Sequence, residues 1–197
     1  MRSFTAVLSL ALVATSVIAA PVDERATCSD VYVYFARGTT EVGTLGTVVG
    51  PGLKRDITIA LLGRSVEFEG IDYPANLVGY LAGGDAGGAR TMANSVTATA
   101  AACPNAKIVI SGYSQGAQVT HLAARQLPAA IQNRINAVVT FGDPYEDTAL
   151  PGVLESRRKT FCNFGDLICQ GLSVILAPHL TYGTDTPAAA AFVKSKV

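Results

Sequence analysis

One serine stands in a pattern that could supply a catalytic nucleophile. Gly112-Tyr113-Ser114-Gln115-Gly116 has the G-x-S-x-G spacing. It directly follows the apolar run 107–111 and directly precedes a helical pattern, which is the context that confirms this motif. Because glycine lacks a Cβ atom, Gly112 and Gly116 remove the clashes of a sharp strand-to-helix turn. We therefore predict that Ser114 is a nucleophile with an exposed hydroxyl, rather than a simple helix N-cap.

A serine hydroxyl is a weak nucleophile until a base takes its proton. The chain has two histidines. His121 lies seven residues into the helix after Ser114, about two turns along, and should point away from it as a surface or hydrogen-bonded histidine. His179 follows Pro178 in a predicted loop near the C-terminus, which agrees with the hydrolase order of serine, acid and histidine. We predict His179 as the base.

The third member of a triad is a carboxylate that orients the histidine. Asp143 follows the apolar run 136–141, although an Asp-Pro pair is also a common turn initiator. Asp166 lies between Cys162 and Cys169, where a closed loop would hold its carboxylate at little cost in ordering. We therefore favour Asp166 as the carboxylate of the triad, with Asp143 as its rival. The acidic residues between the serine and the histidine are Asp143, Glu146, Asp147, Glu155 and Asp166.

Ester hydrolysis also needs hydrogen-bond donors for the oxyanion of the tetrahedral intermediate. The backbone N–H of Gln115, the residue after the nucleophile, supplies one in this type of fold. Thr39, which follows the run 31–35 and the small residue Gly38, could offer its N–H and its hydroxyl. An ordinary polar turn explains that loop equally well.

Apolar residues near these positions could hold an acyl chain. The run 171–178 lies between Cys169 and the predicted base, and exposed apolar surface commonly marks a binding site. Burial of this run in the core is the competing interpretation. The predicted substrate-binding residues are Leu77, Tyr80, Val174, Ile175 and Leu180.

Strand and helix patterns alternate along the chain, which indicates parallel βαβ units. The expected strands are 31–35, 65–71, 107–111, 136–141 and, more weakly, 159–161, and the expected helices are 53–62, 89–102, 115–127 and 187–197. Periodicity alone does not separate a flavodoxin-like fold from a hydrolase fold, but the serine motif favours the hydrolase. The predicted fold class is a three-layer α/β/α sandwich around a mainly parallel five-stranded sheet, a minimal α/β-hydrolase without a lid.

The first twenty residues have the features of a secretory signal peptide. Arg2 precedes the apolar stretch 7–20, which ends in small residues and is too short to span a bilayer. We predict a signal peptide over 1–20, a short segment over 21–27 and one domain over 28–197. The predicted location is extracellular, with no membrane anchor.

Composition narrows the classes of partner. Apolar residues make up 49% of the 197 residues and charged residues 15%, against about 25% in a typical domain, which excludes intrinsic disorder. Fifteen basic and fifteen acidic residues leave no basic surplus for binding nucleic acid. The expected partner is an ester substrate, the expected cofactor and metal content is none, and the expected state is a monomer.

Four cysteines behind a secretory signal favour disulfides over free thiols. Three pairings are possible. Cys162 and Cys169 are close in sequence and separated by a Gly-Asp turn, which favours a local bridge and leaves Cys28 to pair with Cys103.

From Cys28 to its last helix, the chain resembles the cutinase family of serine esterases. The resemblance rests on YFARGTTE, GYSQG, FCNFGDLIC and APHLTYG in this order. It implies a triad of Ser114, Asp166 and His179, an oxyanion hole from Thr39 and Gln115, and the bridges Cys28–Cys103 and Cys162–Cys169. Many cutinases have serine where this chain has Thr39, whose branched side chain is stiffer.

The resemblance implies a secreted esterase that acts through an acyl-enzyme on cutin-like polyesters and short-to-medium acyl esters. The segment IDYPANLVGYLAGG also looks like the related acetylxylan esterases. An acetylxylan esterase is therefore the alternative function. An inactive secreted binding protein on the same scaffold is the third hypothesis.

Overall fold

A five-stranded parallel sheet runs through the centre of the protein. The computed structural model describes Met1 and residues 28–197, so apart from Met1 the predicted signal peptide and the segment 21–27 lie outside the described residues. The strands occur in the spatial order β2-β1-β3-β4-β5, and every neighbouring pair is parallel. They are β1 (Val31–Ala36), β2 (Val66–Gly70), β3 (Lys107–Tyr113), β4 (Ile135–Phe141) and β5 (Arg158–Phe161).

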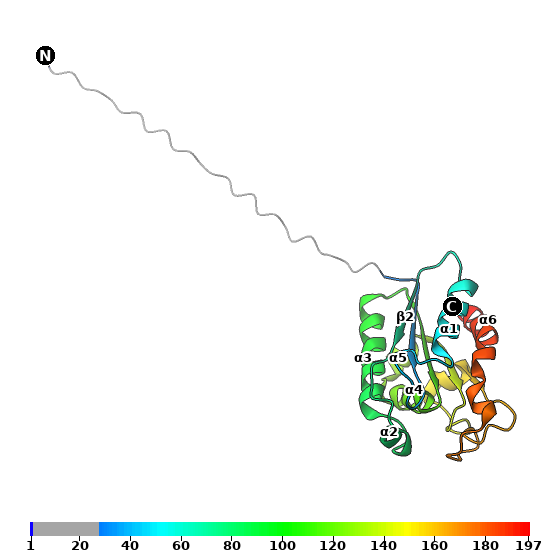
Figure 1. Ribbon diagram of the computed structural model, residues 1–197. Coiled ribbons are helices and arrows are strands. Elements are labelled where there is room, and N and C mark those ends of the chain that lie inside the picture. Colours follow the sequence, from blue (N-terminus) through cyan, green and yellow to red (C-terminus); the bar gives the residue numbers. More distant parts are fainter. Residues whose placement is uncertain (2–27) are drawn as a thin grey trace.

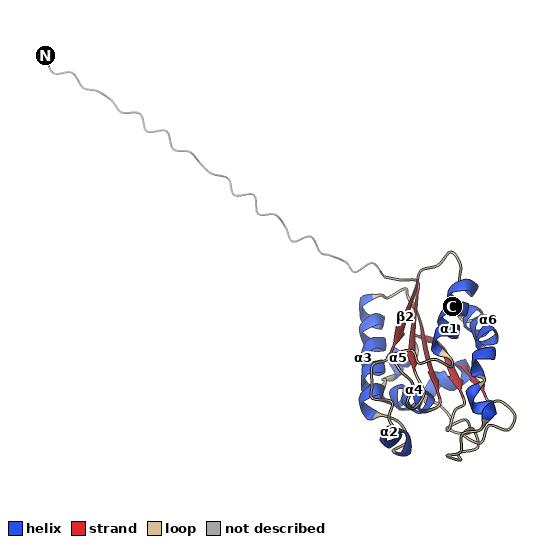
Figure 2. Cartoon of the chain, in the orientation of Figure 1, coloured by secondary structure: helices blue, strands red, loops and turns tan. Residues whose placement is uncertain are grey.

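Helices cover both faces of this sheet, so the three-layer α/β/α class predicted from the sequence is confirmed (Figure 1). In Figure 2, α3 stands on one side of the red strands, and α1 and α6 stand on the other. The helices are α1 (Gly50–Ala60), α2 (Leu77–Leu81), α3 (Ala86–Ala102), α4 (Gln115–Gln126), α5 (Ala129–Gln132) and α6 (Thr186–Lys194). Three 3₁₀ turns complete the described part of the chain: η1 (Gly152–Arg157), η2 (Ala177–Leu180) and η3 (Tyr182–Thr184).

Strand side chains alternate between two buried cores, as the two-residue period of a strand requires. On β1, Tyr34 packs into the core beneath α3 and α4, whereas Val33 and Phe35 pack into the core beneath α1 and α6. Both faces of the sheet are therefore buried, which explains why the strands read as nearly continuous apolar runs.

The predicted strands and long helices are present, with ends that shift by up to three residues. Three differences concern the short elements. Sequence analysis predicted neither α2 nor α5, because four- and five-residue helices are too short for a helical period to show. The loop predicted around His179 is the 3₁₀ turn η2.

The carboxyl ends of the parallel strands meet along one edge of the sheet, where α/β proteins bind ligands. Ser114 follows β3, and the segment that carries Asp166 follows β5. The structure joins Cys162 to Cys169 across that segment, and joins Cys28 to Cys103 at the opposite end of the sheet. Over the described residues, no helix is both long and apolar enough to cross a membrane.

Candidate active site

The backbone at Ser114 is held in a strained turn. Its φ of 57° lies in the left-handed region, and its N–H donates to the carbonyl of Phe141 at 2.9 Å. Although Ser114 stands at the N-cap position of α4, its hydroxyl does not cap that helix. A Cβ atom on Gly116 would collide with the carbonyl of Ala36, and one on Gly112 would collide with the carbonyl of Gly116. Both glycines are therefore needed for this turn.

Ser114, His179 and Asp166 form a continuous chain of hydrogen bonds. Ser114 Oγ lies 3.0 Å from His179 Nε2, and His179 Nδ1 lies 2.8 Å from Asp166 Oδ2. Because an ionised carboxylate only accepts hydrogen bonds, Nδ1 carries the proton and Nε2 is free to accept the serine proton. The arrangement matches a nucleophile, a base and an orienting carboxylate.

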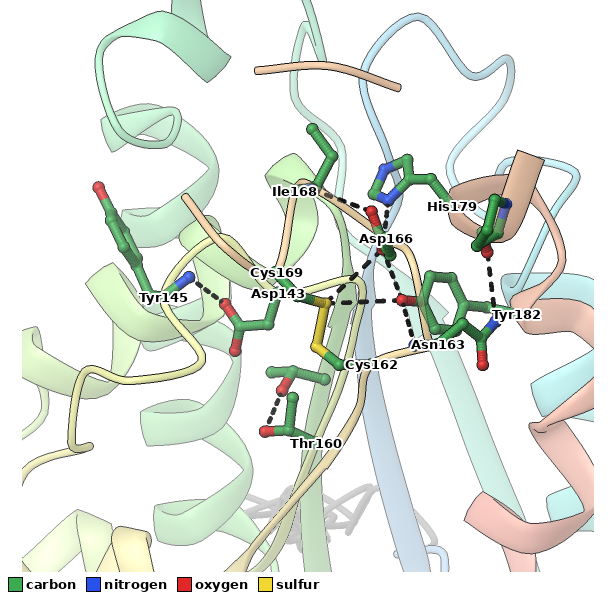
Figure 3. Close-up of a disulfide and its surroundings, with 12 residues drawn as sticks. Asp143, Tyr145, Thr160, Cys162, Asn163, Asp166, Ile168, Cys169, His179 and Tyr182 are labelled. Atoms are coloured by element: carbon green, nitrogen blue, oxygen red, sulfur yellow. Dashed lines mark hydrogen bonds and ion pairs between the residues drawn. A yellow bond between two sulfur atoms is a disulfide. The ribbon is translucent and has the colours of Figure 1, made fainter. Parts of the chain in front are cut away.

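Asp166 receives two further hydrogen bonds that hold its carboxylate toward His179 (Figure 3). The N–H of Ile168 donates to Oδ1 at 3.0 Å, and the Tyr182 hydroxyl donates to Oδ2 at 2.5 Å. Burial, together with the adjacent carboxylate, raises the pKa of Tyr182 well above its ordinary value, so this hydroxyl keeps its proton and remains a donor. Sequence analysis did not identify Tyr182, because nothing in its spacing links it to Asp166.

The main chain at His179 and at the residue before it is also held by hydrogen bonds. The Tyr113 hydroxyl donates to the His179 carbonyl at 2.8 Å, and Asn163 Nδ2 donates to the Pro178 carbonyl at 3.2 Å. The rings of Tyr113 and His179 pack with centroids 5.2 Å apart. These contacts leave the imidazole little freedom, so it faces the serine before any substrate binds.

Gly142 sits directly against the imidazole, which yields a testable prediction. Its φ is 52°, and a Cβ atom there would lie 2.8 Å from His179 Cε1 and 2.9 Å from Nδ1. Gly142→Ala should push the ring away from Ser114 Oγ and lower kcat for a short-chain ester by about 10²-fold, since displacements of about 1 Å have effects of that size.

Gly63→Ala is the matched control for this substitution. Gly63 has a φ of 91°, and a Cβ atom there would contact nothing within 4 Å. The control carries a similar backbone strain without the collision, so its kcat should match that of the unmodified protein. Equal kcat values for the two variants would show that the contact between Gly142 and His179 does not control the geometry of the base.

The loop that carries Thr39 is anchored on both sides. Thr40, which has a φ of 63°, donates its N–H to the carbonyl of Ala75 at 2.7 Å, and Gly38 donates its N–H to Glu41 Oε2 at 2.7 Å. Thr39 lines the same cavity as Ser114. Of the two predicted contributors to the oxyanion hole, Thr39 thus lies at the same cavity as the predicted nucleophile, and Gln115 directly follows that nucleophile in the sequence.

A cavity of about 200 Å³ opens beside Ser114, and we call it the acyl cavity. Its lining residues are Thr39, Leu77, Tyr80, Leu81, Ser114, Ile168, Ser173 and Ile175. Leu77, Tyr80 and Ile175 were predicted from the sequence, whereas Leu81 and Ile168 were not. The position of Leu81, one helical turn after Leu77, is the signal that could have identified it.

Two of the predicted substrate-binding residues, Val174 and Leu180, do not line the acyl cavity, and both are about half exposed. The prediction of an exposed hydroxyl at position 114 needs correction. Ser114 is not an exposed residue, because only 5% of its surface is accessible. The side chains of Leu81 and Ile168 line the cavity next to Ser114. They lie near each other because segments far apart in the sequence pack together.

His121 and the rival acid Asp143 form a second histidine–carboxylate pair. His121 Nε2 lies 2.9 Å from Asp143 Oδ2, and both side chains are fully buried. Of the two alternatives in the sequence analysis, His121 is thus the hydrogen-bonded histidine and not a surface residue. Asp143 also accepts a hydrogen bond from the N–H of Tyr145, as an Asp at a turn commonly does. The structure therefore brings Asp166, and not Asp143, to His179.

Comparisons with known proteins identify the family of this chain. The family described as Cutinase matches residues 27–197. Cutinase CUT1 of Coprinopsis cinerea is 68% identical over 98% of this chain and 99% of its own length. A Trichoderma reesei cutinase, solved in complex with a C11Y4 phosphonate inhibitor, is 43% identical with a TM-score of 0.80, over 84% of this chain and 75% of that one. An acetyl xylan esterase structure is 26% identical with a TM-score of 0.72, over 86% and 99% of the two chains. This chain belongs to the cutinase family.

Proposed function

We propose that this protein is a secreted serine esterase that cleaves short-to-medium acyl esters and cutin-like polyesters through an acyl-enzyme. The observation that carries the proposal is the hydrogen-bonded chain from Ser114 through His179 to Asp166, placed at the wall of an apolar cavity. Its family membership makes it a carboxylic ester hydrolase of the cutinase type.

Each member of the chain has one role in the proposed reaction. Ser114 Oγ attacks the ester carbonyl while His179 Nε2 takes the serine proton, and the imidazolium then returns a proton to the leaving alcohol. Water, activated by the same imidazole, releases the acid and restores the serine. Asp166 stabilises the charged imidazole, and Thr39 with the N–H of Gln115 binds the oxyanion.

The acyl cavity supports a preference for short acyl groups. Its volume of about 200 Å³ is below the roughly 300–1,000 Å³ of common small-molecule pockets. Leu77, Leu81 and Ile175 line it and are each more than half exposed, so they extend an apolar surface from the cavity to the outside. A longer chain, or a chain within a polymer, would lie along that surface.

An acetylxylan esterase is the second candidate, and the structural likeness to an acetyl xylan esterase favours it. An enzyme that removes acetyl groups from a polysaccharide needs polar contacts for the sugar next to a small acyl site. The exposed leucines and isoleucine around the acyl cavity support the first candidate instead.

Two disulfides support secretion, because such bridges persist in oxidising compartments. A monomeric state, the default for a chain of this size, is part of the same proposal.

An acyl-length series combined with one substitution tests the proposed substrate class. The unmodified protein should hydrolyse p-nitrophenyl butyrate faster than acetylated xylan. Ile175→Asp should lower kcat/KM for the butyrate and for longer acyl esters by about 10-fold, since losing even one methylene contact in an apolar pocket costs about that much. The acetate ester should be affected less, because its acyl group has fewer apolar atoms that can contact Ile175.

Leu62→Asp is the matched control, because Leu62 is also exposed but lies just after α1, outside the acyl cavity. It should leave the whole series unchanged. If acetylated xylan is the better substrate and Ile175→Asp behaves like Leu62→Asp, the protein is an acetylxylan esterase and the apolar surface does not bind substrate.

A further inference from the structure

The hydroxyl of Tyr182 shares its hydrogen-bond acceptor with His179, the predicted base (Figure 3). Asp166 Oδ2 lies 2.5 Å from the Tyr182 hydroxyl and 2.8 Å from His179 Nδ1, whereas Oδ1 accepts the N–H of Ile168 at 3.0 Å. Two donors on one oxygen atom weaken each other, because each of them stabilises the same negative charge. The hydrogen bond from Tyr182 therefore reduces the attraction between Oδ2 and a protonated His179 ring.

Neighbouring groups fix the direction of the Tyr182 hydroxyl. The N–H of Asn163 donates to the Tyr182 oxygen at 2.9 Å, which leaves the hydroxyl proton to point toward Asp166. The ring is fully buried and packs edge-on against Phe141 and His179, with centroids 6.2 and 6.1 Å away. Contacts within the protein thus hold this hydroxyl against the carboxylate.

Tyr182 acts on the carboxylate as a neutral group. Burial, followed by the hydrogen bond to Asp166, raises the pKa of Tyr182 well above its ordinary value. A neutral donor stabilises the ionised carboxylate without adding a charge of its own. Its effect on His179 therefore passes through Asp166 and needs no contact with substrate.

We propose that Tyr182 is a positioning residue that extends the activity of this protein to lower pH. Because its hydroxyl stabilises part of the charge on Asp166, less of that charge is left to favour a second proton on the His179 ring. The ring therefore stays neutral, and able to accept the serine proton, in more acidic solution. This inference rests on the proposed esterase function, because it concerns the base of that reaction.

Other ionisable side chains lie around the same hydrogen bonds and must be kept constant in a test. Burial raises the pKa of Glu146, and Asp166 adds to this effect. The neighbouring groups are Glu41 before α1, Tyr113 on β3, Asp143 and Glu146 after β4, Arg158 on β5 and Asp185 before α6. All of them remain in the variants that test the proposal, so a difference between those variants reports on the Tyr182 hydroxyl.

Tyr182→Phe removes the hydroxyl and keeps the ring. The ratio kcat/KM for p-nitrophenyl butyrate should be measured from about pH 4 to about pH 9, because its decline on the acid side reports protonation of the base in the free enzyme. In Tyr182→Phe the midpoint of that decline should move to higher pH by about half a unit, which corresponds to part of the energy of one hydrogen bond. Above the midpoint kcat should change little, because the serine and its base remain in place.

Tyr34→Phe is the matched control. Tyr34 is also buried, and its hydroxyl lies 2.5 Å from Thr99 Oγ1, but it packs into the core on the opposite face of the sheet from Tyr182. The control should lose a similar free energy of unfolding, measured by urea denaturation, and its midpoint should not move. A purely structural role of Tyr182 predicts this same result for both variants.

A second change at position 182 should move the midpoint in the opposite direction. Site-specific incorporation of meta-fluorotyrosine keeps the hydroxyl but makes the phenol more acidic, so it donates a stronger hydrogen bond to Asp166. The midpoint should then move to lower pH. This variant keeps the acceptor for the Asn163 N–H, so it decides the question even if Tyr182→Phe fails to fold.

Movement of the midpoint in the expected direction in each folded variant at position 182 supports the inference. A midpoint that stays in place in either folded variant, or that moves in the opposite direction, would overturn it. In those cases the unmodified protein still cleaves the ester and the proposed function stands, whereas failure of the unmodified protein to cleave the ester at any pH would refute the proposed function itself.

Discussion

Ser114→Ala should lower kcat for p-nitrophenyl butyrate by a factor of about 10⁴–10⁶, the range found when a catalytic serine of this type is removed. The physical reason is that Ser114 Oγ is the atom that both lies 3.0 Å from His179 Nε2 and lines the acyl cavity. Without it the acyl-enzyme cannot form, and only the binding and oxyanion groups continue to accelerate attack by water. Initial rates with a high enzyme concentration measure the residual activity.

The double variant Ser114→Ala with His179→Ala provides a sharper test. Because the two residues act as one unit, the double variant should be no slower than the slower single variant. A fluorophosphonate probe should label the unmodified protein and the control Ser95→Ala, but not Ser114→Ala. Residual activity above about one per cent in Ser114→Ala, or labelling of that variant, would contradict the assignment of the nucleophile.

Asp166→Asn should lower kcat by about 10⁴-fold with little change in KM, as the same replacement does in other triads. The carboxylate of Asp166 both accepts the proton-bearing Nδ1 of His179 and stabilises the imidazolium during the reaction. An amide cannot supply that charge, and its NH₂ end favours the wrong tautomer of the histidine. The rate should be measured together with KM and the folded fraction, because a loss of substrate binding would raise KM, and a folding defect would lower the apparent kcat without changing KM.

Asp143→Asn is the matched comparison, since Asp143 holds the other buried histidine. Its kcat should remain within about 10-fold of the unmodified protein, whereas its free energy of unfolding should fall by about 3 kcal/mol, because one partner of a buried pair is removed. Urea denaturation measures that difference. If Asp143→Asn has the larger loss of kcat, the assignment of Asp166 as the orienting carboxylate is wrong.

The difference in free energy of unfolding between the unmodified protein and Asp143→Asn should also depend on pH. Burial raises the pKa of Asp143, but the hydrogen bond and charge of His121 outweigh this effect and hold the pKa below its ordinary value. The carboxylate therefore contributes stability above the unfolded pKa of about 3.9, and this contribution is lost as the pH falls through the folded pKa. The advantage of the unmodified protein over Asp143→Asn should shrink below about pH 4.

The main features of the fold and the order of the candidate site residues could be read from local patterns. The strand–G-x-S-x-G–helix pattern predicts a sharp turn, because its residues allow the backbone conformations that such a turn needs. Ser114 has the positive φ that this turn requires. A parallel sheet places all its carboxyl ends on one edge, so residues that follow different strands can meet there. The contact between Asp166 and His179 agrees with the order of serine, acid and histidine on which the sequence prediction rested.

Only the tertiary structure decided which side chains surround Ser114. The acyl cavity is formed where α2 approaches the 168–175 segment, so Leu81 and Ile168 line it while Val174 and Leu180 do not. The pair of His121 and Asp143, and the contact of Gly142 with His179, arise in the same way. Local sequence limits the conformation of each segment, but a cavity wall or a buried pair depends on the packing of segments far apart in the chain, and no single segment carries that information.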